Sequence, residues 1–523
     1  MNRRQFVQAG AAALAIPSLA RAQAATTLKF VPYADLALLD PLVSSFATRN
    51  HVLMVFDTLY GLDAASRAQP QMVEGHRVEE EGRRWRLTLR PGLRFHDGEP
   101  VLARDVVPSL QRWASRDSFG DALLAATEEL SAPDDRTVEF RLRRPFPLLP
   151  EALAKPTNQM AAIMPARLAA TPNTRQLPEI VGSGPFRYVA GERVPGARNV
   201  YRRFEGYAPH PDGTPSFTAG PRLAHFEQVE WLTIPDPATA TAALQRGEVD
   251  WVEQPLMDLV PLLSRDRALA LKVVETTGLI GFLRFNCLHP PFDNPAIRRV
   301  LLKAVRQRDC MTAVVGGDGT GINDRVGIFT PGMPMATEAG LEVMQGPVDL
   351  PALRRELAAA GYKGERVVFL AATDVPRINA ICEVTAQACR DLGMTLDYQQ
   401  TDWGTVTQRI PRQSPPDQGG WSAFCAYNGG YDFANPAGHL QLRGTGPRAW
   451  IGWPTSERLE ALRTAWLEAP EAAQPALARD IQLQAWQDVP YLPLGAYFQP
   501  TAFRRNLTGM LEGLPIFWNL RRA

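Results

Sequence analysis

The sequence predicts an α/β protein with more than one domain, and three observations lead to this fold class. A chain of 523 residues corresponds to two to four domains at roughly 100–200 residues per domain. Short alternating strands and turn signals dominate the first part of the chain. Strands then alternate with helices, which is typical of a layered α/β unit.

The stretch 86–110, RLTLRPGLRFHDGEPVLARDVVPSL, shows these elements in order. Apolar residues alternate with polar ones over 85–90, which is the period of a half-buried strand. Two turn dipeptides, Pro-Gly and Asp-Gly, follow within 91–98. Apolar residues at helical spacing over 106–113 predict a helix. His96 and Asp97, side by side in the turn, raise the question of a catalytic pair.

Further along, residues 366–374 form a continuous apolar run that predicts a buried strand. A helical pattern over 378–394 follows, and 396–403 returns as a strand. Strand, helix and strand in this order predict a βαβ-like unit. Residues 456–488 predict helix with two interrupting prolines.

The first 24 residues predict an export signal. They combine a basic start, a weakly apolar stretch and two small-x-small cleavage sites at Ala20–Ala24. Arg3-Arg4 resembles the twin-arginine signal, which exports folded proteins, although Asn2 and Gln8 depart from its favoured residues and leave the Sec route open. Cleavage removes three arginines and takes the net charge from +1 to about −2.

Five cysteines occur without a CxxC motif, at Cys287, Cys310, Cys382, Cys389 and Cys425. An odd number in an oxidising compartment leaves at least one free thiol unless a cysteine pairs between chains. One disulfide remains possible, and buried apolar thiols are the alternative.

The chain lacks the usual motifs of catalytic, metal and nucleic-acid sites. Its seven histidines form no HExxH, and Gly420–Phe424 lacks the last glycine of GxSxG. The glycine-rich segment 316–321 has no following Lys-Ser/Thr for a phosphate loop. A net charge of +1 gives no basic surface for nucleic acid, and no apolar run reaches membrane-spanning length. The sequence therefore predicts no enzyme, no cofactor and no metal.

Several motifs in order resemble the family 5 solute-binding proteins, the dipeptide-, oligopeptide- and nickel-binding components of ABC importers. The family's F-H-D-G turn is intact at 95–98, and VGSGPFRYV at 181–189 resembles its G-T-G-P-Y/F segment. Residues 240–253 resemble its A-L-x-x-G-E-x-D step, and 283–305 its N-x-x-x-P-P-F block. Within this resemblance Asp97 and Gly98 suit a capped turn, and His96 most simply holds the loop.

The resemblance implies a two-lobed periplasmic-binding-protein fold (type II, cluster C), with a ligand cleft between the lobes. Lobe 1 is expected from residues 25–60, 180–275 and 497–523, with a sub-domain inserted at 61–179. Lobe 2 is expected at 276–496. Two crossing segments, near Thr277 and Gln499, would act as hinges for closure around the ligand.

The function implied by the resemblance is transport. The protein would be a periplasmic monomer that captures a short peptide or another amine-bearing small solute. It would deliver this ligand to an ABC permease and ATPase complex at the inner membrane, with no nucleic acid involved.

Five residues are the candidate ligand contacts. In peptide-binding relatives an Asp in a D-Y-x-D/E-P segment pairs with the ligand's ammonium, and Asp432 in GYDFANPAGHL matches that position. A turn-capping Asp is the alternative. Tyr431, Tyr427 and Trp421 could form apolar walls or belong to the core, and Tyr33 follows the first strand, where relatives reach the cleft. Arg377 is considered as a carboxylate partner but is not assigned that role.

Two other functions remain open at this point. A secreted hydrolase on the same fold would need a nucleophile, a base and an orienting group, which the sequence does not assemble. A chaperone or sensor that presents its ligand to a receptor would differ only in its partner.

Export is expected to remove residues up to Ala22–Ala24. Intact-mass analysis of the periplasmic protein should show the shortened chain, and retention of residues 1–20 would contradict the signal. Replacing Arg3-Arg4 with Lys-Lys should block export by the twin-arginine route. Continued export of that variant would instead indicate the Sec route.

Overall fold

The computed structural model describes residues 26–43, 45–157, 159–317 and 321–523, so the predicted signal at 1–24 lies outside the described residues. The chain divides into two compact units. Unit 1 contains the described residues up to Pro145, then Leu149–Val274 and Pro500–Ala523, and unit 2 contains Phe146–Leu148 and Glu275–Gln499. The predicted hinges and the inserted sub-domain stay predictions.

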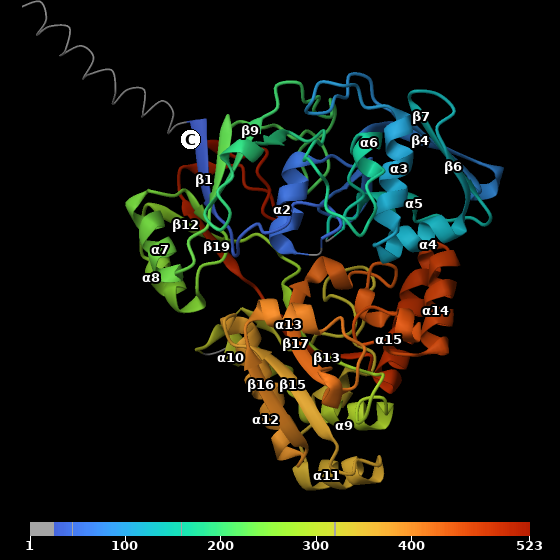
Figure 1. Cartoon of the computed structure of the whole chain (residues 1–523), viewed down its shortest axis with the longest axis vertical. Coiled ribbons are helices and arrows are strands. Elements are labelled where there is room, and N and C mark those ends of the chain that lie inside the picture. Colours follow the sequence, from blue (N-terminus) through green and yellow to red (C-terminus); the bar gives the residue numbers. More distant parts are fainter. Residues whose placement is uncertain (1–25, 44, 158, 318–320) are drawn as a thin grey trace, which may run out of the picture. The chain divides into compact units, whose positions relative to one another are not determined.

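A seven-stranded sheet forms the centre of unit 1, in the order β12-β19-β11-β1-β10-β9-β8 (Figure 1). The central strand β1 runs parallel to both β10 and β11, and Phe30 pairs with Trp231 on one side and Trp251 on the other. The remaining neighbours are antiparallel. The strands are β1 (Thr27–Val31), β8 (Phe186–Tyr188), β9 (Arg198–Arg203), β10 (Gln228–Leu232), β11 (Trp251–Val252), β12 (Leu269–Val273) and β19 (Pro500–Arg504).

Two helices cover this sheet through one apolar cluster. Helix α7 (Pro237–Arg246) begins at Asp236, whose carboxylate accepts from the Thr239 N–H, and is followed by Gly247 at φ +74°. It is followed by α8 (Val260–Ser264). Leu244 and Leu263 from these helices pack against Val31, Val252 and other buried strand residues. Such burial is the main stabilisation of the layer.

A second sheet in unit 1 has the order β4-β5-β7-β6. The predicted strand at 85–90 is confirmed as β5, the predicted turns follow it, and the predicted helix is confirmed as α3, with Pro108 inside it. The elements are β4 (Val73–Glu79), β5 (Arg84–Leu89), α3 (Ala103–Ala114), α4 (Ser118–Ala126), β6 (Thr127–Ser131) and β7 (Thr137–Leu142). Unit 1 also contains α2 (Phe46–Val55), β2 (Tyr60–Leu62), β3 (Ala68–Pro70), α5 (Leu149–Ala154), α6 (Ala166–Ala169), β20 (Leu507–Thr508) and β21 (Arg521–Arg522).

His96 joins its turn to the segment 181–186. Its backbone N–H donates to the Gly182 carbonyl at 2.9 Å, and its ring Nε2 lies 2.9 Å from the Gly184 carbonyl oxygen. Gly182 lies so close to α2 that a Cβ would stand 2.0 Å from the Val55 carbonyl oxygen. Two motifs of the resemblance thus meet in one buried contact, and His96 holds the turn.

Asp97 and Gly98 also have the turn roles expected from the sequence. The Asp97 carboxylate accepts from the Glu99 N–H at 3.1 Å and pairs with Arg167 at 3.0 Å. Gly98 has φ +94°, which favours glycine. These contacts account for Asp97 structurally.

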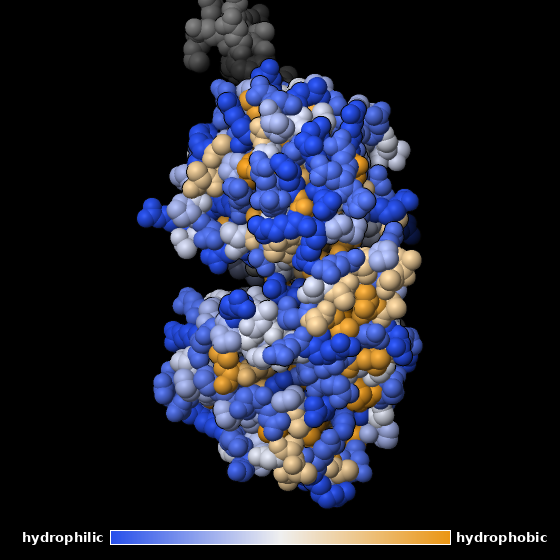
Figure 2. All heavy atoms as spheres, turned by 90° about the vertical axis from the view of Figure 1, so that its right-hand side faces the viewer, coloured by the Kyte–Doolittle hydropathy of each residue, from blue (hydrophilic) through white to orange (hydrophobic). Residues whose placement is uncertain are grey.

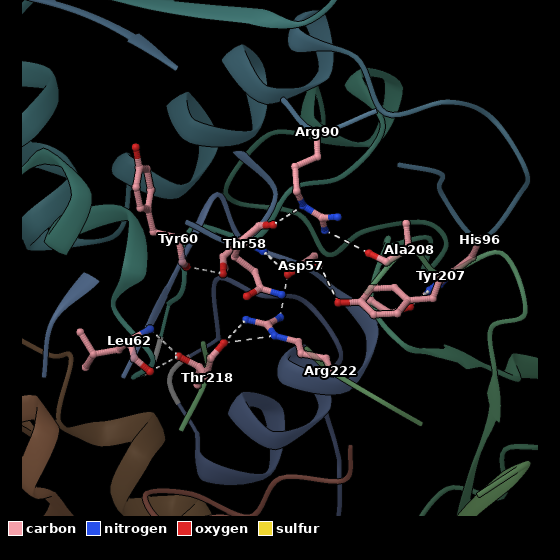
Figure 3. A network of polar contacts seen from close by, with 12 residues as sticks. Asp57, Thr58, Tyr60, Leu62, Arg90, His96, Tyr207, Ala208, Thr218 and Arg222 are labelled. Carbon is pink, nitrogen blue, oxygen red and sulfur yellow. Dashed lines mark hydrogen bonds and ion pairs between the residues drawn. The ribbon is translucent and has the colours of Figure 1, made fainter. Parts of the chain in front are cut away.

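A polar network in unit 1 surrounds the buried ion pair of Asp57 and Arg222 (Figure 3). The two groups are 2.7 Å apart, and the Tyr207 hydroxyl donates to Asp57 at 3.1 Å. Arg222 also donates to the Thr218 carbonyl at 2.7 Å and lies over the Trp518 ring. Burial, and then the nearby Asp57 carboxylate, raise the pKa of Tyr207, so its hydroxyl stays a donor.

Unit 2 contains a six-stranded sheet in the order β14-β18-β13-β17-β15-β16. Strand β15 is parallel to both β16 and β17, so the predicted βαβ unit is confirmed as β15–α12–β16. Strand β13 is antiparallel to β17 and β18. The strands are β13 (Leu279–Phe285), β14 (Ile322–Asn323), β15 (Arg366–Ala372), β16 (Thr395–Thr401), β17 (Ala423–Gly429) and β18 (Tyr491–Tyr497).

Helices flank the sheet of unit 2, and α12 packs on β15 and β17 (Figure 1). They are α9 (Pro295–Ala304), α10 (Gln307–Val315), α11 (Leu350–Ala359), α12 (Pro376–Asp391) and α13 (Trp403–Arg409). The predicted interrupted helix is confirmed as α14 (Glu457–Glu468) and α15 (Gln474–Asp488), with the break around Pro470.

All five cysteines lie in the described part of the chain, and each is a free thiol. Cys287 is partly exposed and the other four are buried. Burial raises the pKa of Cys389 to about 12, which keeps the thiol protonated and unreactive. The structure contains no disulfide among these five cysteines, and the four buried thiols lie in the core of unit 2.

No helix in the described part is long and apolar enough to cross a membrane. The face shown in Figure 2 is largely hydrophilic, with hydrophobic residues in scattered patches.

His96→Ala is expected to lower the free energy of unfolding without changing ligand affinity. The buried Gly184 carbonyl would lose its hydrogen-bond partner, which should lower the free energy of unfolding by about 1–3 kcal/mol near pH 7.5. Burial lowers the pKa of His96 from 6.5 to about 4. Between pH 6.5 and pH 4 the histidine therefore binds a proton in the unfolded chain but stays neutral in the folded protein. The stabilisation is complete above pH 6.5 and is lost as the pH falls toward 4.

Urea unfolding at several pH values checks this. The difference in the free energy of unfolding between wild type and His96→Ala should decrease as the pH falls from 6.5 to 4. His210→Ala, at a more exposed histidine of unit 1, is the matched control and should leave the stability almost unchanged. Loss of ligand binding at an unchanged Tm would contradict the structural role of His96.

Candidate functional site

Tyr427, Tyr431 and Asp432 lie close together at one end of β17 in unit 2. Tyr427 is in the strand itself, and the strand ends at Gly429. Tyr431 and Asp432 belong to the short 3-10 turn η6 (Gly430–Phe433) that follows directly. Both turn residues are partly exposed. The structure thus brings three of the five candidate residues to one edge of the sheet.

The turn that contains Asp432 is held by close backbone packing. Gly430 donates its N–H to the Gly278 carbonyl at 2.9 Å, and its carbonyl accepts from the Thr330 hydroxyl at 2.5 Å. A Cβ at position 430 would stand 2.4 Å from the Thr277 carbonyl oxygen, so only glycine fits. Asp432 therefore belongs to a turn whose first residue, Gly430, is held through both its N–H and its carbonyl group.

Trp421 lies in the core of unit 2. Its side chain is completely buried, and its indole N–H donates to the Ile410 carbonyl at 3.0 Å. The ring packs against Phe424 and Trp453 at centroid distances of 5.1 and 5.8 Å. These contacts favour the core role, which the sequence had left open.

Arg377, which the sequence analysis left unassigned, lies beside these candidates. It is in the first turn of α12, which follows the end of β15. Its guanidinium carbon lies 5.4 Å from the Tyr427 ring centroid and 5.9 Å from that of Tyr497, and its Nη1 donates to Gln499 Oε1 at 2.9 Å. A guanidinium, a group that can form two parallel hydrogen bonds to a carboxylate, therefore lies between two aromatic rings.

Sequence reasoning could not find this arrangement from spacing alone. Gln499 is 122 residues from Arg377 in the chain. Only the pairing of β13 with both β17 and β18 brings Tyr427 and Tyr497 together. A single Arg after Pro376 otherwise has the pattern of an exposed helix start.

Arg377 and Asp432 lie at the same edge of the sheet of unit 2. Strands β15 and β17 are parallel, and each residue follows the carboxyl end of one of them. Ligands of open α/β sheets bind beyond the carboxyl ends of the strands. The edge therefore offers one cationic and one anionic side chain.

Two tyrosines of this edge keep their protons. Burial, and then the Glu275 carboxylate, raise the pKa of Tyr431 to about 12. Burial also raises the pKa of Tyr497, although the Arg377 guanidinium acts in the opposite direction. Both hydroxyls can therefore donate at neutral pH.

Tyr33 lies in unit 1, just beyond the carboxyl end of β1. Its backbone N–H donates to Glu253 Oε2 at 2.8 Å, and Glu253 Oε1 accepts from the Asn50 amide at 2.8 Å. The Tyr33 ring packs edge-on against Phe46 at 5.7 Å. A buried carboxylate thus fixes the loop after β1 to α2 and to the end of β11.

No group of three His, Cys, Asp or Glu side chains within the described ranges is arranged to hold a metal ion.

Comparison with known proteins gives the family. Residues 67–444 match the family described as Bacterial extracellular solute-binding proteins, family 5 Middle. A probable peptide ABC transporter periplasmic-binding protein of Sinorhizobium fredii is 34% identical over 534 residues, covering 100% of both chains. The glutathione-binding protein of Pectobacterium atrosepticum is 24% identical, over 97% of this chain and 96% of its own.

Solved structures share the fold. The periplasmic binding protein DppA of Helicobacter pylori, in complex with the peptide STSA, has a TM-score of 0.78 at 18% identity, covering 96% of this chain and 99% of its own. The dipeptide binding protein of Pseudoalteromonas, in complex with Met-Leu, has a TM-score of 0.77 at 18% identity, covering 95% and 100%. These likenesses confirm the α/β periplasmic-binding-protein fold of cluster C.

The hydrolase alternative is wrong, because the family consists of transport proteins and not of enzymes. This chain belongs to the family 5 bacterial extracellular solute-binding proteins, the substrate-binding components of ABC transporters.

Proposed function

We propose that this protein binds a short peptide, or a similar small solute with both an ammonium and a carboxylate group. Asp432 would pair with the ammonium and Arg377 with the carboxylate. The observation that carries the proposal is that these opposite charges lie at one sheet edge of unit 2, beyond the ends of β17 and β15. A ligand with two opposite charges matches such a pair.

The aromatic residues near these charges suit the rest of such a ligand. Tyr427 lies beside the Arg377 guanidinium, and Tyr431 is next to Asp432 in the chain. We assign both tyrosines to the ligand surface of unit 2, and Tyr33 to that of unit 1. Trp421 supports this surface from the core, since its ring packs on Phe424 in β17.

The proteins that resemble this chain support a peptide-like ligand. The Sinorhizobium relative is described as a probable peptide transporter component, and two of the solved structures contain the peptides STSA and Met-Leu. A free dipeptide has an ammonium at one end and a carboxylate at the other. Removing both charges from water is tolerable only when each meets a charged, hydrogen-bonding partner.

We infer that the ligand is taken up in the periplasm and passed to a membrane permease driven by an ATPase, and that the protein acts as a monomer exported by the twin-arginine route. Binding would be accompanied by hinge motion near Thr277 and Gln499, the crossing segments that the resemblance implies. A receptor in place of the permease would leave the ligand site unchanged.

Asp432→Asn is expected to weaken ligand binding strongly, because it keeps the shape of the side chain and removes its charge. Losing one partner of a buried ion pair commonly costs about 3–5 kcal/mol. At about 1.4 kcal/mol per factor of ten, this is a hundred- to several-thousand-fold loss of affinity. Titration calorimetry with the solute that remains bound through native purification, and with Met-Leu, measures it.

Asp417→Asn is the matched control, since Asp417 is an exposed residue of the same unit and should leave the affinity unchanged. If Asp432 only caps its turn, Asp432→Asn should leave the ligand affinity almost unchanged, because Asn caps a turn nearly as well as Asp. An affinity change below about threefold in Asp432→Asn would therefore reject the anchoring role.

A further inference from the structure

Two of the segments that connect unit 2 to unit 1 lie next to the proposed ligand anchors. The first connection leads from Glu275 to β13, and its residue Gly278 accepts the N–H of Gly430, two residues before Asp432. The second ends at Gln499, whose side chain accepts from Arg377. The first contact joins two backbones, whereas the second joins two side chains.

Gln499 occupies a restricted position in the chain. It follows β18, which ends at Tyr497, and precedes Pro500. Proline disfavours the helical conformation of the residue before it, which restricts the Gln499 backbone. The preceding Phe498 is fixed as well, because its N–H donates to the Gly321 carbonyl at 3.0 Å. The Gln499 side chain therefore starts from a well-defined backbone.

The two tyrosine rings and Gln499 constrain different motions of Arg377. The ring centroids of Tyr427 and Tyr497 are 6.2 Å apart at 71°, and each lies within 6 Å of the guanidinium carbon. Cation–π attraction draws the guanidinium toward the rings but leaves it free to turn in its own plane. A directional hydrogen bond to Gln499 Oε1 restricts that rotation.

We propose that Gln499 is a positioning residue of the ligand site, which orients the Arg377 guanidinium toward the ligand carboxylate and joins it to the second connection between the units. This inference rests on the proposed function, in which Arg377 meets that carboxylate. Bidentate Arg–carboxylate pairing depends strongly on orientation, so the effect of Gln499 is specific to ligands with a carboxylate.

The test compares Met-Leu with its C-terminal amide, which keeps the ammonium and lacks the carboxylate. Gln499→Ala should weaken Met-Leu about tenfold by titration calorimetry, as expected for losing one hydrogen bond to a charged group. The same variant should leave the affinity for the amide unchanged. Gln499→Glu keeps the acceptor but adds a negative charge next to Arg377, so it should weaken Met-Leu at least as much.

A merely structural role gives another pattern. Gln499→Ala would then lower the affinity for Met-Leu and for its amide equally and would also lower the Tm. Gln499→Glu would restore the affinity for both probes. This pattern would overturn the proposal. Gln387→Ala is the matched control, because Gln387 lies exposed on α12 and its hydrogen bonds go to neighbouring residues of the same helix, to Asp391 at 2.8 Å and from Arg390 at 3.4 Å. It should change neither affinity.

A second measurement needs no ligand and separates this inference from the proposed function. Rotation about the Nε–Cζ bond of Arg377 can be followed by nitrogen NMR of arginine-labelled protein, with the signal assigned by Arg377→Lys. Gln499→Ala should speed this rotation severalfold, and Gln387→Ala should not. If the wild type binds neither Met-Leu nor its amide, the proposed peptide-like ligand is wrong. An unchanged rotation rate of Arg377 in Gln499→Ala overturns the positioning role of Gln499, whether or not the wild type binds these probes.

Discussion

Unit 1 depends on the buried ion pair between Asp57 and Arg222 (Figure 3). Both side chains are at most 2% exposed and lie 165 residues apart in the chain. Residues 61–179, which the sequence assigned to an inserted sub-domain, fall between these two partners. Because breaking a buried pair leaves an uncompensated charge, at about 3–5 kcal/mol, the intact pair holds together the two chain segments that contain Asp57 and Arg222. Tyr207 and Trp518 complete the enclosure.

Unit 2 uses a buried arginine in a different way. Arg284 in β13 is fully buried and donates to the backbone carbonyls of Gln441, Trp450, Ile451 and Pro490. Burial lowers its pKa to about 10, which still leaves it charged at neutral pH. It pairs in register with Phe424, near the start of β17. The loops at that end are therefore fixed, and the opposite end of β17 remains for Asp432 and its neighbours.

The candidate site holds its two charged residues by different kinds of contact. Gly430 sets the Asp432 turn through backbone contacts that leave no room for a side chain. Arg377 instead contacts the rings of Tyr427 and Tyr497 and the side-chain amide of Gln499.

The sequence alone determined the elements with strong local patterns and the motif-bearing turns. The alternation of apolar and polar residues predicted β5, and a continuous apolar run followed by a helical pattern predicted β15 and α12. The dipeptide Asp97-Gly98 predicted the turn in which it lies. These elements could be predicted because each depends on residues that are neighbours in the chain. The resemblance of its motifs to those of the family 5 solute-binding proteins led to the family and to Asp432 as a candidate anchor.

Only the tertiary structure decided which distant side chains meet. It placed Trp421 in the core and Arg377 among Tyr427, Tyr497 and Gln499. Periodicity shows that a residue faces an apolar layer, but it does not say whether that layer continues as core or ends at a sheet edge. That difference depends on strand order, here on β13 lying between β17 and β18, which long-range pairing and not local preference sets.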